Sequence, residues 1–240
     1  MIQAKIVAGS KNPFNDKKLV TFQLRYPRII HAEVMTHAML VKNSSSSRAI
    51  PFSKKVEAVS NDPFIPIAWQ KDHKGMQGTE YIDAPIDKAY IHDMWLKARN
   101  YAIEMSTKLN TFGGRHGGVT KQLCNRLLEP FEYIDVVISG TEWEHFFFFF
   151  CPKYTIKDSV NGTTVYRSKK DCIKWFDDIE EAYTTGLNWL AINESQAEIH
   201  IQALAELMWD LYQSYDYKML EPGDYHLPFI EIEEDLEILK

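Results

Sequence analysis

The residues between His37 and Arg48 are the part of this sequence whose types and spacing best suit chemistry. From residue 36 to residue 48 the chain reads THAMLVKNSSSSR, with four serines between an asparagine and an arginine. Asn43 tolerates left-handed backbone geometry, and small serines allow backbone N–H groups to approach a ligand. Arg48 carries a planar fork of donors that fits a phosphate or a pair of carbonyls. The pattern indicates an anion-binding loop after a helix closed by His37, and the alternative is a polar turn with a surface arginine.

A second candidate is Arg126, which lies among three leucines in KQLCNRLLEP at 121–130. We expect its helix to be mostly buried, and an arginine on an apolar helix needs a partner. That partner is either a structural carboxylate, Glu129 or Glu132, or a ligand.

Hydrophobic periodicity predicts the elements that must hold these residues. Val20, Phe22, Leu24 and Tyr26 alternate with polar residues, which is typical of a half-buried strand, and YIDVVI at 133–138 predicts another strand. Helices are expected at 27–40, 51–59, 85–110, 119–128, 141–150, 173–190 and 194–215, and loops at 42–48 and 61–85. Strands separated by helices indicate an α/β or α+β domain.

Two further stretches stand out. Residues 152–172 are polar and contain an Asn-Gly pair between the short strand-like segments YTIKDSV and TTVYR, so they predict a β-hairpin. The run Phe146 to Phe150 places phenylalanines on every face of a helical turn. Such a segment must be buried all round, and burial against another subunit is the natural way to achieve this.

Bulk composition excludes several classes of protein. The chain has 240 residues, of which 45% are hydrophobic, which is enough to form the core of one large domain. A net charge of −6 argues against long nucleic acid as a partner. Three scattered cysteines indicate neither a disulfide framework nor a zinc site. Without a signal peptide or a bilayer-spanning apolar run, we expect a cytoplasmic protein with no membrane partner.

The order and spacing of the two arginine-containing stretches resemble the flavin-dependent thymidylate synthases. The signature of that family is R-H-R-x-x-S-x-N-x-x-S-x-R, and residues 36–48 match it at His37, Asn43, Ser46 and Arg48. LRYPRIIHAEVMTH, KQLCNRLLEPFEYIDVVISGTEWEHFF and SQAEIHIQALAE are similar to further blocks of the family. The resemblance covers roughly 18–151 and 194–230, and it is closest to the longer variants found among bacteria and their viruses.

The resemblance implies a fold and an activity. It implies one domain over 1–240 with a central, mostly antiparallel sheet flanked by long helices and a β-hairpin and helix insertion near 152–193. It also implies homotetramers with active sites between subunits. FAD, reduced by NADPH, provides the hydride that reduces a one-carbon unit delivered by methylenetetrahydrofolate to C5 of dUMP, which gives dTMP.

The resemblance also assigns residues, and no protein nucleophile is among them. The FAD contacts would be His37, Asn43, His145 and Gln196. The substrate contacts would be Glu33, Ser44, Ser45, Ser46, Ser47, Arg48 and Arg126. Arg48 and Arg126 would be the main charged contributors.

This sequence departs from the family at several positions. Thr36 and Ala38 replace the two signature arginines that flank the histidine, and Val41 replaces the first signature serine. Phe150 occupies the position of an arginine that polarises the pyrimidine ring in the family. A fixed cation at that place contributes several kcal/mol to stabilising charge on the ring, and phenylalanine cannot supply it.

Several explanations of the missing cations remain open. The substrate can be another base, such as that of dCMP, or the product can be a hydroxymethyl nucleotide used for modified DNA. The protein can also be a non-catalytic flavin- or nucleotide-binding protein. Finally, the insertion can supply a replacement cation from Lys153, Arg167, Lys169 or Lys170, although these residues are also typical of a solvated hairpin.

Overall fold

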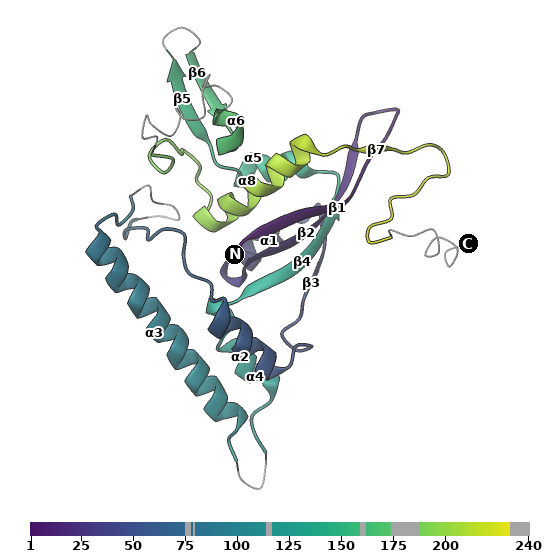
Figure 1. Cartoon of the computed structure of the whole chain (residues 1–240). Helices are drawn as coiled ribbons and strands as arrows, with labels where there is room; N and C mark the ends of the chain where they lie inside the picture. Colours follow the sequence, from purple (N-terminus) through teal and green to yellow (C-terminus); the bar gives the residue numbers. More distant parts are fainter. Residues whose placement is uncertain (75–77, 79, 114–116, 159–161, 174–187, 231–240) are drawn as a thin grey trace.

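A five-stranded sheet forms the centre of the protein in a computed structural model that describes residues 1–74, 78, 80–113, 117–158, 162–173 and 188–230 (Figure 1). The strand order is β3-β4-β2-β1-β7. The strands are β1 (Gln3–Lys11), β2 (Lys18–Pro27), β3 (Val41–Ser44), β4 (Tyr133–Gly140) and β7 (Lys218–Met219). All neighbours pair antiparallel except β1 and β7. The expected α/β fold with a mostly antiparallel sheet is confirmed.

One face of the sheet holds the main core. The alternating side chains of β2, from Val20 to Tyr26, are almost completely buried, as their period of two predicts. Residues of β4 join them from the neighbouring strand. Two helices, α5 (Trp143–Phe150) and α8 (Ile199–Ser214), contribute to the same cluster and cover this face. Figure 1 shows α8 crossing the sheet with α5 beside it.

A second group of helices lies near the start of β4. It consists of α2 (Phe52–Asn61), α3 (Pro85–Asn110) and α4 (Lys121–Arg126), which pack around a smaller core of Val59, Leu128 and Phe131. Figure 1 shows α3 as a long helix along one side of the molecule. The sequence predicted α2 and α3 closely. Of the predicted apolar stripe of α3, Ile91, Trp95, Ala102 and Met105 are partly buried, whereas Ala98 and Leu109 are exposed.

Several predicted boundaries are wrong, and local geometry explains them. The helix expected at 27–40 is a 3-10 turn (Arg28–Ile30) followed by α1 (His31–Thr36). The expected loop at 42–48 begins as strand β3, because its backbone pairs with β4. The helix expected at 119–128 is shortened to α4 and followed by a 3-10 turn, Glu129–Phe131, which contains Pro130.

The helix expected at 194–215 begins at Ile199. The carboxylate of Glu198 accepts hydrogen bonds from the backbone N–H groups of His200 and Ile201, so it caps the first turn. Capping satisfies donors that a helix start leaves without partners, and this sets the boundary.

The predicted hairpin is confirmed as β5 (Tyr154–Asp158) paired with β6 (Gly162–Tyr166), and α6 (Lys169–Ile173) follows it. Gly162 has a positive φ of 79°, which suits the tight turn expected at this place. Most of the helix expected at 173–190 lies outside the described residues, and 188–190 are not helical.

No helix in the described part of the chain is long and apolar enough to cross a bilayer.

Candidate functional site

Two histidines from different elements meet beside the sheet. His37 follows α1 and is buried, while the more exposed His145 projects from α5. Nδ1 of His145 lies 3.3 Å from Nε2 of His37, and the ring centroids are 4.9 Å apart. Burial lowers the pKa of His37 below its ordinary value of 6.5, and the neighbouring His145 and Lys42 lower it further. A neutral imidazole can donate from one nitrogen and accept at the other.

A cavity of about 570 Å³ opens next to this pair. Its walls include Glu33, Phe148, Phe149, Phe150, Lys153 and Gln196. The ring centroids of His37 and Phe150 are 6.1 Å apart, and those of His145 and Phe149 are 4.8 Å apart. The histidine pair and the cavity therefore share two phenylalanines. Such a site, with aromatic walls and a few polar groups, suits a planar ring system that can hydrogen bond at its edge.

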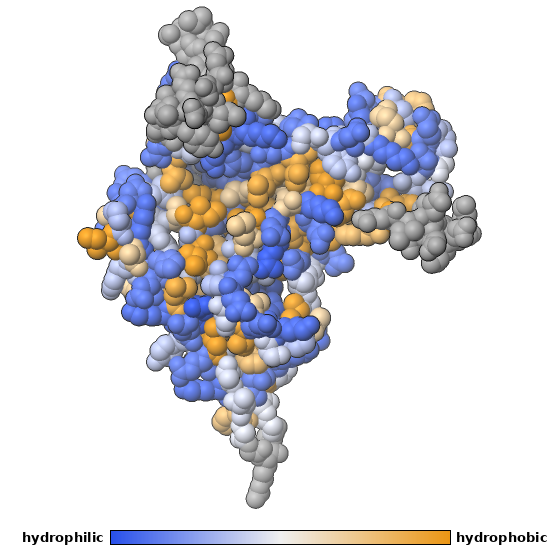
Figure 2. Space-filling view, in the orientation of Figure 1, coloured by the Kyte–Doolittle hydropathy of each residue, from blue (hydrophilic) through white to orange (hydrophobic). Residues whose placement is uncertain are grey.

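The phenylalanine run is buried on one side of α5. Phe146 and Phe147 are buried in the core, but Phe148 is 55% exposed and Phe149 is 51% exposed in the single chain. Full burial of the run therefore does not occur within this chain. Figure 2 shows apolar side chains gathered over the middle of the molecule, along α8 and between α3 and the sheet.

The serine-rich stretch forms a turn that follows β3. Asn43 and Ser44 are exposed residues of the strand, and the N–H of Ser45 donates to the Asp135 carbonyl at 2.9 Å, which extends the β3–β4 ladder. Ser46 then closes the turn, because its hydroxyl accepts from the N–H of Arg48 at 3.2 Å. The Arg48 side chain is exposed and has no ion pair within the described part of the chain. It is free to meet an anion.

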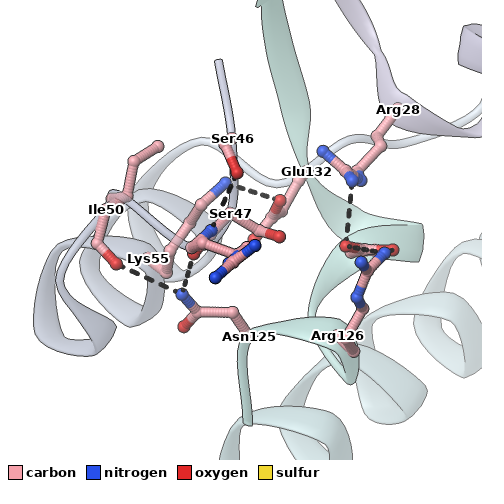
Figure 3. Close-up of polar contacts among 10 residues, drawn as sticks. Arg28, Ser46, Ser47, Ile50, Lys55, Asn125, Arg126 and Glu132 are labelled. Carbon is pink, nitrogen blue, oxygen red and sulfur yellow. Dashed lines mark hydrogen bonds and ion pairs between the residues drawn. The ribbon is translucent and has the colours of Figure 1, made fainter. Parts of the chain in front are cut away.

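Asn125 anchors this turn, and sequence reasoning missed it. Its side chain is fully buried, and Nδ2 donates to the Ser47 carbonyl at 2.8 Å and to the Ile50 carbonyl at 3.3 Å (Figure 3). One amide thus holds both ends of the segment that carries Arg48. Because Asn125 precedes Arg126, the segments of the two arginines lie side by side. A polar asparagine within KQLCNRLL was the signal that could have revealed it.

The expectation that the helix around Arg126 is mostly buried is wrong. Its side chain is 59% exposed, and Leu123 and Leu127 beside it are also exposed, since α4 packs through other residues. Of the two carboxylates considered as partners, the structure selects Glu129, whose Oε1 lies 3.2 Å from Nη1 of Arg126. Arg28 reaches the same oxygen at 3.0 Å, and Figure 3 shows the two arginines pointing toward each other.

The other carboxylate, Glu132, pairs with Lys55 in the interior. The Lys55 ammonium lies 2.6 Å from Oε2 of Glu132, and both side chains are buried. Burial raises the pKa of Glu132, and the hydrogen bond from Lys55 opposes this. Oε1 of Glu132 and Oδ1 of Asn125 are buried without a hydrogen-bond partner in the described structure. This ion pair fixes α2 against the start of β4, below the serine turn.

The candidate residues therefore form two groups at opposite ends of β3. Glu33 and Gln196 line the cavity, and the His37–His145 pair contacts its wall through Phe150 and Phe149, near the start of the strand. Ser46, Ser47, Arg48 and Arg126 lie past its other end. A four-residue strand spans roughly 13 Å at about 3.3 Å per residue. Asn43 lies on the strand between the groups and is not among the described residues that line the cavity.

The basic residues of the insertion are dispersed. Arg167 pairs with Glu144 at 3.2 Å and lies over the Trp209 ring, so it is not a freely solvated hairpin residue. Lys169 pairs with Glu206 of α8 at 3.2 Å. Lys170 is exposed. Lys153 alone of the four lines the cavity.

Comparisons with known proteins place the fold. No protein-family model matches the chain, and no curated protein matches it. Two solved structures of a UMP/dUMP methylase, PolB from Streptomyces cacaoi, are similar to it. The structure bound with 5-Br UMP has a TM-score of 0.54, and the one bound with 5-Br dUMP has a TM-score of 0.57. Both are 13% identical, and the alignments cover 91% of this chain and 90% and 91% of the others. At this identity, the likeness shows a shared fold.

Proposed function

We propose that this protein is an enzyme that transfers a one-carbon unit to C5 of a pyrimidine nucleotide, with dUMP as the favoured substrate and dTMP as the product. The observation that carries the proposal is the close approach of two candidate site residues that are distant in the chain. The family resemblance assigned His37 and His145 to one flavin site, and the fold brings their ring nitrogens to 3.3 Å. The likeness of the fold to structures of a UMP/dUMP methylase supports the same class of substrate.

The serine turn suits the phosphate of the nucleotide. Arg48 is exposed and unpaired within the described residues, and the Ser46 hydroxyl and nearby backbone groups lie beside it. Arg126 is held by Glu129 through one nitrogen, so other donors of its guanidinium remain available. Two guanidinium groups on adjacent segments can bind a phosphate by charge-assisted hydrogen bonds.

The cavity suits a flavin ring. Gln196 on its wall and the His37–His145 pair next to Phe150 and Phe149 offer hydrogen-bonding groups, and the phenylalanines offer apolar walls. Asn43 fits this group less well, because it lies apart on β3. When bound, FAD reduced by NADPH supplies the hydride that the transferred carbon needs to become a methyl group. The protein residues orient the reactants and exclude water, while C5 gains a bond to the carbon from methylenetetrahydrofolate and loses its proton.

Phe150 favours a second candidate. It lines the cavity where the resemblance led us to expect an arginine, so the chemistry of the ring can differ. The protein would then act on dCMP, form a hydroxymethyl product, or bind flavin and nucleotide without turnover.

The test begins with the visible spectrum of the purified protein with added FAD. We expect a flavin spectrum that bleaches with NADPH, and tritium release from [5-³H]dUMP that depends on methylenetetrahydrofolate. A protein that neither takes up FAD nor bleaches would contradict the proposal. Parallel reactions with dCMP, followed by product mass, separate the second candidate from the first.

A further inference from the structure

Lys153 is the one cation that lines the cavity among the described residues. Its ammonium lies 5.3 Å from the centroid of the Phe148 ring, on the aromatic wall, and Phe150 lines the same cavity. Residue 153 is the second residue of the insertion, and only Cys151 and Pro152 separate the phenylalanine run from this lysine. A charge against an apolar wall acts with less screening than a charge in water.

The backbone of Lys153 is held from both sides. Its N–H donates to Oδ1 of Asn193 at 3.0 Å, and its carbonyl accepts from the N–H of Glu194 at 3.0 Å. Asn193 is itself fixed by a bond from its Nδ2 to Oε1 of Gln202 on α8, at 2.6 Å. The side chain therefore starts from a fixed point, which is the condition for a preorganised charge.

The ammonium of Lys153 is not neutralised by a neighbouring carboxylate in the part of the chain that the structure describes. This distinguishes it from Arg167 and Lys169, which are paired with Glu144 and Glu206. Two carboxylates also line the cavity. Glu198 is engaged with the start of α8 and with the His200 ring, whereas Glu33 is exposed. The cavity thus offers one cation and one available carboxylate.

That combination fits a ring with both acceptor oxygens and an N–H donor. A pyrimidine base carries carbonyl oxygens and, in uracil, an N3–H group. When N3 loses its proton to solvent, negative charge lies on N3 and the ring oxygens and C5 becomes a better nucleophile, and a positioned cation stabilises this ionised base. The phenylalanine at position 150 carries no charge and cannot do this.

We propose that Lys153 is the residue that stabilises the N3-ionised pyrimidine ring, the form in which C5 is the better nucleophile. This inference rests on the proposed function, because it needs the pyrimidine to bind in this cavity beside the flavin ring. It selects one of the four basic residues of the insertion on the basis of position and free charge. Lys153 is thereby a catalytic residue that compensates for Phe150.

The test uses 5-bromo-dUMP, whose N3–H ionises to an anion with a distinct ultraviolet spectrum. The bound nucleotide is titrated with pH on the full-length protein, the Lys153→Met variant and a Lys153→Gln variant. A cation near the ring favours the ionised base, so we expect its ionisation constant to be about 10-fold higher on the unmodified protein than on either variant. The matched control is Lys157→Met, which removes an exposed lysine of the same hairpin.

The turnover rate provides a second measurement, and it can also show whether a second substitution restores activity to Lys153→Met. We expect Lys153→Met to lower kcat for tritium release by about 10- to 100-fold, with a much smaller change in the dissociation constant for 5-bromo-dUMP. Adding Phe150→Arg to Lys153→Met should restore part of kcat, because the charge returns to the same cavity. Loss of a merely structural residue would not be rescued in this way.

The outcomes separate this inference from the proposed function. If the unmodified protein binds neither 5-bromo-UMP nor 5-bromo-dUMP, the proposed function fails and the role of Lys153 fails with it. If the protein binds the nucleotide but the base ionises equally on the unmodified protein and both Lys153 variants, only the role of Lys153 is overturned. Thermal unfolding by circular dichroism confirms that each variant used is folded.

Discussion

His37 and His145 are 108 residues apart in the chain, and Nε2 of the first lies 3.3 Å from Nδ1 of the second. One follows α1 and the other projects from α5, and both elements contribute residues to the main core. The rings also contact Phe150 and Phe149, which line the cavity. The pair is therefore held by the core of the protein, and protonation of the buried His37 affects stability.

The first prediction concerns acid stability. Because burial lowers the pKa of His37 from its ordinary 6.5, the unfolded state binds the proton more readily. The free energy of unfolding should therefore fall as pH drops below 6.5 and through the lower pKa of the folded state. His37→Gln should reduce this slope in denaturant titrations at several pH values. His31 and His226 also have pKa values lowered by burial, so part of the slope should remain.

The control for this experiment is His92→Gln, an exposed histidine of α3. An unchanged slope in His37→Gln would contradict the inference that the buried His37 contributes to acid sensitivity.

The second prediction concerns Asn125. Asn125→Ala removes both hydrogen bonds that hold the turn from Ser47 to Ile50. We expect a loss of about 1–3 kcal/mol in unfolding free energy, because buried carbonyls lose their donor. We also expect weaker dUMP binding by calorimetry, because Arg48 is no longer held in place. Gln122→Ala, an exposed change on the same helix, is the control. Reduced stability with unchanged dUMP affinity would show that Asn125 does not position the turn.

The third prediction concerns the buried ion pair. Lys55→Met leaves the Glu132 carboxylate without its partner, which should cost about 3–5 kcal/mol at neutral pH. Burial raises the pKa of Glu132, so the folded state favours its protonated form, and stability should be lost as pH rises above the ordinary value of 4.5. The defect of Lys55→Met should thus be smaller in acid than at neutral pH.

The double variant Lys55→Met/Glu132→Gln tests the cause. It should recover much of the lost stability at neutral pH, because no unpaired charge remains in the interior. A double variant as unstable as Lys55→Met would show that lost packing, not the buried charge, is responsible.

The fourth prediction concerns assembly. We proposed a homotetramer from the resemblance, and α3 carries exposed apolar side chains at helical spacing, namely Ile86, Tyr90, Met94 and Tyr101. These four residues fall on one stripe, which is typical of a helix that packs against a partner. Light scattering should give a mass near four times 27.9 kDa. Met94→Glu combined with Tyr101→Glu should lower it, whereas Ala89→Glu, outside the stripe, should not. A monomeric unmodified protein would contradict the prediction.

Local patterns were sufficient for much of the fold. The alternation in β2 predicted its buried face, because successive side chains of a strand point to opposite sides. The helical spacing in α3 predicted its length, and the Asn-Gly pair predicted the β5–β6 hairpin. Each of these depends on residues that are neighbours in the chain. The pairing of β3 with β4 depends on residues that are distant in the chain, and this is why β3 was expected to be a loop.

For the candidate site too, some features could be predicted from the sequence and others depend on the tertiary structure. The sequence by itself determined which residues carry suitable chemistry, such as His37, Arg48 and Arg126, because residue type and order are local properties. The tertiary structure alone decided that Arg126 is exposed, that Asn125 holds the serine turn, and that Lys153 lies on the cavity wall. Burial and contact are set by which segments pack together, and hydrogen bonds and free charges depend on partners that are distant in the chain.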